Sequence, residues 1–388
     1  MTAAEPLVPR YGEASLSDLV PSVLAALGLP GFANPLGIES LPGVCVLVVD
    51  GLGWELVRGH RDSAPFLAAA SDRGRSLTAG FPSTTSASLA SLGTGLPPGQ
   101  HGLVGYTFAL PGLDRPINSL HWVPYGFGPT EDLRERLVPE EVQPEPTVLE
   151  RAAAAGTEIT LVGPAAHADS GLTRAILRGG RYAPADSLEE LVLAVGAAFA
   201  ERRTSVYAYH PFLDTYGHVK GVGSYEWLAH LEQVDGAVSS IAERLPFGFA
   251  LVVTADHGML NIPEEGRLDV ADAPGLLEGV RLLGGEARAR HVYAWPGAER
   301  DVFASWRETL GDRYWVRTRD EAVDAGWFGP KVLDRVRPRI GDVVAAAHDP
   351  IGVFQREVDP LQASLVGHHG SLTQVEQLVP FLLIRPEG

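Results

Sequence analysis

The sequence is poor in cysteine and in lysine. Among its 388 residues, Cys45 is the single cysteine, and Lys220 and Lys331 are the two lysines. A chain with one cysteine forms no internal disulfide framework and no site in which several cysteines bind zinc. A metal ion bound by this chain must therefore be held by histidine and carboxylate side chains.

Positive charge and long apolar runs are scarce as well. The chain has 31 basic and 48 acidic residues, which gives a formal net charge of -17, whereas tight binding to a nucleic-acid backbone needs a basic surface. No stretch approaches the roughly 18 to 20 apolar residues of a membrane span. The first residues also lack a basic region followed by a long apolar segment. We therefore predict a cytoplasmic protein that binds neither nucleic-acid polymers nor membranes.

What the chain does contain is an alternation of strand-like and helix-like segments. Hydrophobic residues make up 45% of it, enough for a large core. Short apolar runs rich in β-branched residues predict buried parallel strands. They lie at Val44–Asp50, Glu158–Val162, Ser205–Tyr209, Phe249–Thr254, Val343–Ala347 and Val379–Ile384. Helical spacing appears at Ala64–Arg73, Thr147–Ala155, Ser187–Arg202 and Tyr225–Arg244. This order predicts an α/β three-layer sandwich with a mostly parallel central sheet.

Two segments interrupt this alternation. Residues 260–341 are rich in Gly, Pro and Arg, and we predict that they form an inserted cap on a catalytic core of residues 1–259 and 342–388. Residues 105–146 are rich in proline and aromatic side chains, and we expect them to form a wall over the functional site.

Polar residues terminate several of the predicted strands. They are Asp50, Asp214 and His218 in DTYGH, Asp256 and His257 in TADHG, and His368 and His369 in VGHHGSL. Taken singly, a strand-terminal Asp is usually a helix cap or turn residue. Ligands of open α/β sheets bind at the carboxyl ends of the strands, however, and all these residues fall at that edge. Together they supply the ligands of two adjacent divalent metal sites, which suit Zn²⁺, with Mn²⁺ as the alternative.

A hydroxyl nucleophile is expected in the segment FPSTTSASLASLGTG, residues 81–95. A loop with several hydroxyl groups leads here into a helix-like stretch. Thr84, Thr85, Ser86 or Ser88 would then lie near a helix N-terminus, where free amide groups favour an anion. The ordinary alternative is a Ser or Thr that caps the helix. A coordinated metal ion can lower the pKa of a hydroxyl enough to make it a nucleophile.

Read in order, these motifs resemble a known family. The segments VLVVDGLG, FPSTTSASLASLGTGLPPGQHGLVGY, DTYGH, TADHGM and HHGSL are similar to those of the alkaline phosphatase superfamily, and most of all to its nucleotide pyrophosphatase/phosphodiesterase branch. The resemblance implies that Thr85 is the nucleophile and a metal ligand. It also implies that one ion is held by Asp50, Asp256 and His257, and the second by Asp214, His218 and His369.

One position departs from the family pattern as we align it. Ser88 stands where we expect an Asn that donates to a phosphoryl oxygen, and its shorter hydroxyl would have to take over that role. No Arg lies between Phe81 and Leu110 to bind a monoester dianion by a bidentate fork. This absence favours a phosphodiester or pyrophosphate substrate.

The resulting hypothesis is a hydrolase that uses two divalent metal ions and cleaves a phosphodiester or pyrophosphate bond of a nucleotide-like small molecule through a phospho-threonine intermediate. A phosphomonoesterase and a phosphonoacetate-type hydrolase are the alternatives within the superfamily. Outside the enzymes, the alternative is a non-catalytic metal-binding module, because fold does not imply function.

Overall fold

The protein is built around one large β-sheet, which the computed structural model describes together with its surroundings over residues 5–200 and 205–386. Within these ranges the sheet has seven strands, in the order β2-β18-β9-β1-β8-β6-β7. The five strands from β9 to β7 are parallel, and β18 is antiparallel to both β9 and β2. Their bounds are β1 Val44–Val49, β2 Arg75–Thr78, β6 Thr160–Gly163, β7 Arg181–Pro184, β8 Ser205–His210, β9 Ala250–Thr254 and β18 Leu378–Ile384. The predicted mostly parallel sheet is confirmed.

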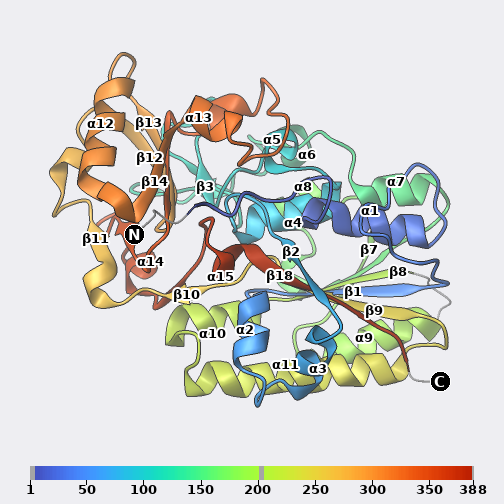
Figure 1. Cartoon of the computed structure of the whole chain (residues 1–388). Helices are drawn as coiled ribbons and strands as arrows, with labels where there is room; N and C mark the ends of the chain where they lie inside the picture. The colour runs from blue at the N-terminus through green and yellow to red at the C-terminus, as the bar shows by residue number, and fades with distance from the viewer. Residues whose placement is uncertain (1–4, 201–204, 387–388) are drawn as a thin grey trace.

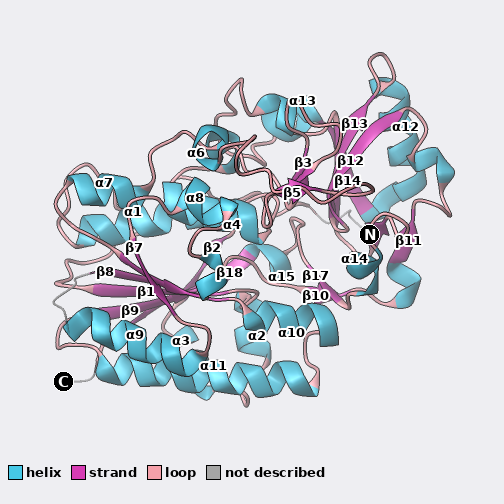
Figure 2. Cartoon of the chain, turned by 180° about the vertical axis from the view of Figure 1, so that it is seen from behind, coloured by secondary structure: helices cyan, strands magenta, loops and turns pink. Residues whose placement is uncertain are grey.

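Helices cover both faces of this sheet (Figures 1 and 2). One face carries α1 Leu16–Ala26, α4 Thr85–Thr94, α7 Val148–Ala154 and α8 Gly171–Ile176. The other carries α2 Trp54–Gly59, α3 Pro65–Ser71, α9 Leu188–Ala200 and α11 Tyr225–Arg244. The three-layer α/β sandwich predicted from the sequence is therefore confirmed.

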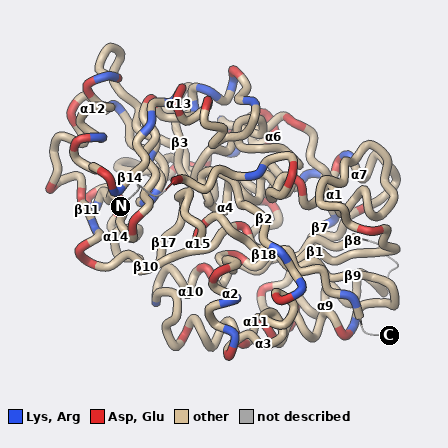
Figure 3. The backbone as a smooth tube through the Cα atoms, in the orientation of Figure 1, with Lys and Arg blue, Asp and Glu red and all other residues tan. Residues whose placement is uncertain are grey.

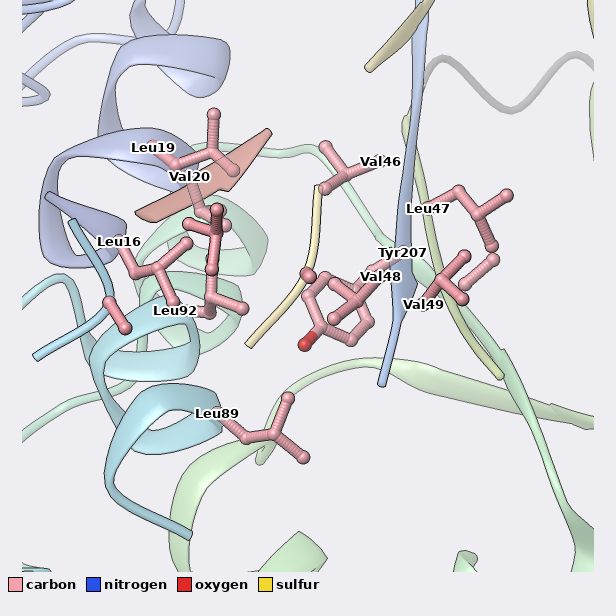
Figure 4. Close-up of a cluster of buried hydrophobic side chains, with 14 of the residues drawn as sticks. Leu16, Leu19, Val20, Val46, Leu47, Val48, Val49, Leu89, Leu92 and Tyr207 are labelled. Atoms are coloured by element: carbon pink, nitrogen blue, oxygen red, sulfur yellow. The ribbon is translucent and has the colours of Figure 1, made fainter. Parts of the chain in front are cut away.

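The alternation of side chains along β1 explains why both faces need a helical layer. Every residue of this strand is buried, and successive side chains point to opposite faces. Figure 4 shows Val46 and Val48 on the side of α1 and α4, whereas Leu47 and Val49 point the other way. Leu92 and Leu16 fill the space between α4, α1 and the strand, and both are fully buried. This core holds the carboxyl end of β1 in place.

A second sheet lies beside the first and is antiparallel, with the order β12-β13-β15-β14. Its strands are β12 Val280–Glu286, β13 Ala289–Ala294, β14 Tyr314–Thr318 and β15 Val343–Ala347, and α12 Glu299–Leu310 packs against it. It has a core of its own, which includes the buried Val292, Trp306 and Val343. The irregular segment of the sequence thus contains an ordered subdomain (upper left in Figure 1).

One predicted strand exists but belongs to a different sheet from the one expected. Val343–Ala347 is a strand, but it pairs with β13 and β14 and not with the central sheet. An apolar run predicts a buried strand and does not tell which of two sheets buries it. Since β10 Leu260–Asn261 pairs with β17 Gly367–His368, the chain leaves and re-enters the core side by side. We therefore propose that the insertion runs from about residue 262 to about residue 366, beyond the predicted boundary at 341.

The proline-rich stretch of residues 105–146 forms a small three-stranded sheet, β3-β4-β5. Its strands are β3 Thr107–Phe108, β4 Ile117–Asn118 and β5 Val123–Pro124, and β3 packs against β12 of the insertion. The remaining elements are α5 Pro98–His101, α6 Pro139–Val142, α10 Phe212–Lys220, β11 Arg267–Asp269, α13 Arg319–Asp324, β16 Gly352–Phe354, α14 Pro360–Ser364 and α15 Gln374–Gln377. Among the described residues, no helix is both long and apolar enough to cross a membrane.

Candidate active site

The site lies at the carboxyl edge of the central sheet, where several parallel strands end. Asp50 follows β1, and Asp256 and His257 follow β9. After β8 the chain turns into α10, which carries Asp214 and His218 one helical turn apart. Every site residue taken from the sequence at these strand ends therefore reaches the same edge, as expected for an open α/β sheet.

The first cluster consists of Asp50, Asp256 and His257, whose donor atoms lie within 4.8 Å of one another. Nε2 of His257 is 3.4 Å from Asp50 Oδ1 and 3.4 Å from Asp256 Oδ2. The Thr85 hydroxyl lies 3.3 Å from the same nitrogen. The hydroxyl predicted to be the nucleophile thus contacts an imidazole that lies between two carboxylates.

The second cluster adjoins the first and shares His257 with it. Donor atoms of Asp214, His257 and His369 lie within 4.8 Å of one another, and the rings of the two histidines stack at a centroid distance of 3.6 Å. His218 Nε2 is 3.3 Å from Asp214 Oδ2. His218 is thus next to Asp214 but outside the closest group of three, so its place in the second ligand set stays a prediction.

Backbone carbonyl groups fix the orientation of the three imidazole rings. Nδ1 of His218 lies 2.7 Å from the Gly367 backbone oxygen, and Nδ1 of His257 lies 3.1 Å from the Gly258 backbone oxygen. Nδ1 of His369 lies 2.9 Å from the Ser83 oxygen. A carbonyl oxygen only accepts, so each Nδ1 must donate its proton. In a neutral imidazole the lone pair is then on Nε2, the nitrogen that faces the carboxylates and that a metal ion would bind.

The neighbouring histidine does not share this arrangement. His368 is buried beside Phe354, and its Nε2 lies 3.1 Å from the Leu365 oxygen. Burial lowers its pKa to about 3. The structure thus directs His369, and not His368, toward the cluster.

The carboxylate oxygens of the clusters face one another without enough donors. Within the described residues, Asp50 Oδ1, Asp214 Oδ1 and Asp256 Oδ2 are buried and have no hydrogen-bond partner. Burial and the nearby charges of Asp256 and Asp214 raise the pKa of Asp50 well above its ordinary value, and burial also raises that of Asp214. Buried polar groups are normally satisfied. Divalent cations would satisfy these oxygens and the imidazole lone pairs together, so the donor set fits two metal ions.

The hydroxyl groups of the 81–95 segment have different environments. Thr85 is the first residue of α4, after the N-cap Thr84. The Ser83 hydroxyl donates to the Ser371 oxygen, and that of Ser86 donates to the Gly105 oxygen. Thr85 therefore combines a helix N-terminus with contact to the clusters. Ser88 is fully buried, its hydroxyl has no partner among the described residues, and its role stays a prediction.

A cavity of about 650 Å³ opens beside Asp50, Thr85 and Asp214. Its walls are mainly aliphatic and aromatic and come from α4, α8, β6, β8 and the 105–146 segment, of which Leu120, His121 and Val123 take part. These positions agree with the wall expected from the sequence. Trp122 itself is fully buried away from solvent and donates from Nε1 to the Leu137 oxygen.

Several site residues were missed by sequence reasoning. Tyr209 donates its hydroxyl to Asp50 Oδ2, and Tyr207 lines the cavity with a hydroxyl that has no partner in the described chain. Tyr207 and Tyr209 share one face of β8, and only knowledge of which face meets the cavity distinguishes them from core residues. Arg134 also lines the cavity, but its guanidinium donates to both carboxylate oxygens of Asp132 and to the backbone oxygen of Asp169.

The family model described as type I phosphodiesterase / nucleotide pyrophosphatase matches residues 44–372. The chain belongs to this family. This family is metal-dependent, and because the protein belongs to it, the protein is a hydrolase of phosphodiester or pyrophosphate bonds. A comparison with curated protein sequences found no match.

Solved structures share the fold of this phosphodiesterase family member. An inactive threonine-to-alanine variant of murine ectonucleotide pyrophosphatase/phosphodiesterase 5, in complex with AMP, is 18% identical with a TM-score of 0.67, over 89% of this chain and 88% of that chain. Phosphonoacetate hydrolase from Sinorhizobium meliloti 1021, in complex with phosphonoformate, is 20% identical with a TM-score of 0.65, over 89% and 90%. At these identities the likeness establishes the alkaline-phosphatase-like fold.

Proposed function

We propose that the protein is a phosphodiesterase that works with two divalent metal ions and uses Thr85 as its nucleophile. The observation that carries the proposal is the position of the Thr85 hydroxyl beside two adjoining clusters of carboxylates and imidazoles that share His257. Asp50, Thr85 and Asp214 also line the cavity, and three buried carboxylate oxygens of the clusters have no hydrogen-bond partner among the described residues. A non-catalytic metal-binding module would have no chemical reason to keep a hydroxyl in that position.

Each ion has a proposed set of ligands in this scheme. One would be held by Asp50, Asp256, His257 and Thr85, and the other by Asp214, His218 and His369. When bound, the ions would lower the pKa of the Thr85 hydroxyl and stabilise the charge on the leaving oxygen. Imidazole and carboxylate ligands together suit Zn²⁺, with Mn²⁺ as the alternative.

The chain's own residues then carry out a double displacement. The Thr85 oxygen attacks phosphorus in line with the leaving ester oxygen, and a phospho-threonine forms as that alcohol departs. A water molecule attacks the same phosphorus in the second step and restores the Thr85 hydroxyl. The free amide groups at the start of α4 are placed to hydrogen-bond phosphoryl oxygens during both steps.

The cavity favours a diester over a monoester dianion. Among the described residues that line it, the one guanidinium is that of Arg134, which is already bound by Asp132, so this part of the chain offers the cavity no free guanidinium for a second negative charge. Figure 3 shows the basic residues, Lys and Arg together, interspersed with acidic residues along the described chain. His121, His167, Tyr182 and Tyr209 line the same cavity and offer ring faces for a nucleobase or another planar group. We therefore infer a small nucleotide-like diester as substrate, and the cytoplasmic location stays a prediction.

The test compares four substrates with metal-replete protein. These are bis-p-nitrophenyl phosphate, thymidine 5′-p-nitrophenyl phosphate, p-nitrophenyl phosphate and phosphonoacetate. We expect the two diesters to be cleaved with the higher kcat/KM and a chelator to abolish turnover. Preferred hydrolysis of the monoester or of phosphonoacetate would instead establish one of the two alternative activities.

The nucleophile is tested by Thr85→Ala, with Ser86→Ala as the matched control. Both changes delete a hydroxyl near the start of α4, but that of Ser86 points to the Gly105 oxygen. We expect Thr85→Ala to lose at least about 10³-fold in kcat, since the loss of a nucleophile removes the reaction path itself. Full turnover in Thr85→Ala would refute the assignment. The threonine-to-alanine change in the inactive murine relative is in keeping with this expectation.

A further inference from the structure

Glu286 is a buried carboxylate that the insertion directs at the metal centre. It is the last residue of β12, and its side chain is 8% exposed. Oε2 lies 3.5 Å from Nδ1 of His369. The second oxygen, Oε1, has no hydrogen-bond partner within the described residues. An unsatisfied buried carboxylate oxygen costs stability, so its retention beside a ligand of the cluster calls for a functional reason.

The loop after His369 is shaped around this side chain. Gly370 has a φ of +125°, and a Cβ built on it would lie 2.8 Å from both Cγ and Cδ of Glu286. A residue with a side chain at this position would collide with the carboxylate and would also be strained in its backbone. Glycine at position 370 therefore allows Glu286 to reach the His369 loop.

Glu286 also contacts the segment that carries the nucleophile. Burial raises the pKa of Glu286 well above its ordinary value, and the neighbouring Thr84 side chain acts against this rise. Thr84 is the N-cap of α4, directly before Thr85. The adjacent Ser83 pairs with Gly370 in an antiparallel bridge, and its carbonyl oxygen accepts from His369 Nδ1. One side chain from the insertion thus touches both the nucleophile loop and the His369 loop.

In its ionised form, Glu286 acts on the tautomer of His369. A carboxylate 3.5 Å from Nδ1 stabilises the form in which this nitrogen carries the proton, and it disfavours rotation of the ring away from the Ser83 oxygen. Nε2 then keeps its lone pair toward Asp214 Oδ1, 4.0 Å away. Partners of this kind orient metal-binding histidines and raise the basicity of the ring.

We propose that Glu286 is a positioning residue of the second metal site, through which the insertion completes the active centre. The proposal rests on the proposed two-metal function, in which His369 binds the second ion. The insertion would accordingly contribute to metal binding, although none of its described residues lines the cavity.

The test is Glu286→Gln, which keeps the shape of the side chain and removes its charge. Zn²⁺ affinity is measured by competition with a chromogenic chelator, and kcat and KM for bis-p-nitrophenyl phosphate are measured at limiting and at saturating Zn²⁺. We expect affinity for one of the two ions to fall about 10- to 100-fold. At limiting Zn²⁺ we expect kcat to fall together with the Zn²⁺ affinity. At saturating Zn²⁺ we expect kcat to recover, and KM should change little at either concentration.

Asp269→Asn is the matched control. Asp269 is a buried acid of the same insertion, and it accepts from the backbone amides of Ala271 and Arg356, away from the cluster. Its replacement should lower the melting temperature and leave the Zn²⁺ affinity unchanged. Glu286→Asp, which keeps the charge on a shorter side chain, should bind Zn²⁺ more tightly than Glu286→Gln.

Two results would overturn the proposal: unchanged Zn²⁺ affinity in Glu286→Gln, or an equal loss of affinity in Asp269→Asn. The wild-type protein is measured in the same experiment. If it bound no metal and cleaved no diester, the proposed function itself would fail. If it bound two ions and Glu286→Gln did so equally well, only the role of Glu286 would fall.

Discussion

The metal-free protein should become more stable when one of its clustered carboxylates is neutralised. In Asp50→Asn, the charge that faces Asp256 and Asp214 is removed, while the amide oxygen still accepts from Tyr209. The new amide group would lie beside Nε2 of His257, which is 3.4 Å from Asp50 Oδ1. The substitution thus removes the repulsion between this carboxylate and its two acidic neighbours.

The magnitude follows from the spacing of the cluster. Donor atoms of Asp50 and Asp256 lie within 4.8 Å, and two unit charges at that distance repel by about 3 kcal/mol at an effective dielectric constant of about 20. Part of this repulsion is already relieved in the wild type, because the raised pKa of Asp50 lets it bind a proton. We therefore expect a gain of about 1 to 3 kcal/mol in the free energy of unfolding at pH 8.

The gain must depend on pH with a defined sign. A carboxyl whose folded pKa is raised binds its proton more tightly in the folded state, so its contribution to stability falls as the pH rises from the unfolded pKa through the folded pKa. The advantage of Asp50→Asn should accordingly be large at pH 8 and small at pH 5. Urea unfolding with a chelator present measures it. A variant less stable than the wild type at both pH values would refute the reasoning. Asp269→Asn, in which a hydrogen-bonded acid is lost, should be destabilised at both.

Two further predictions concern the packing around the site. His291 is fully buried, and burial lowers its pKa to about 4. Its stabilising effect should be complete above the unfolded pKa of about 6.5 and decline toward pH 4 by about 3 kcal/mol. The free energy of unfolding of His291→Gln should therefore depend less on pH than that of the wild type, and an equal dependence would contradict this. Gly258→Ala would place a Cβ 1.9 Å from the Val375 backbone oxygen and 3.1 Å from Gly53 Cα, so we expect it to displace the adjacent His257 and to lose metal binding. As a control, a Cβ at Gly196 meets no atom within 4 Å, so Gly196→Ala should bind metal normally in the same titration.

Much of the fold could be predicted because burial leaves a clear pattern in the sequence. Strands buried on both faces, such as β1 and β9, are continuous apolar runs. The edge strands β2 and β7 were missed, since Arg75–Thr78 and Arg181–Pro184 are short and partly exposed and lack such a run. The helix α1 was missed as well, although Ser15 and Asp18 form a capping box at its start.

The site could be predicted where its residues end strands of the central sheet. Asp50, Asp214 and Asp256 reach one edge because parallel strands place their carboxyl ends together. Glu286 gave no comparable signal, because it belongs to the second sheet, whose packing against the His369 loop is a tertiary contact. The same reason explains the misplacement of β15, whose apolar run does not reveal its partners.

The most direct test of the account is the metal content of the purified protein, measured by elemental analysis on preparations that are also assayed for diester hydrolysis. We predict about two Zn²⁺ or Mn²⁺ ions per wild-type chain, and a clear loss of metal and activity in Asp256→Ala and in His369→Ala. Thr85→Ala should keep most of its metal and lose its turnover. A reconstituted wild-type protein without metal, or unchanged metal content in both ligand variants, would contradict the central claim.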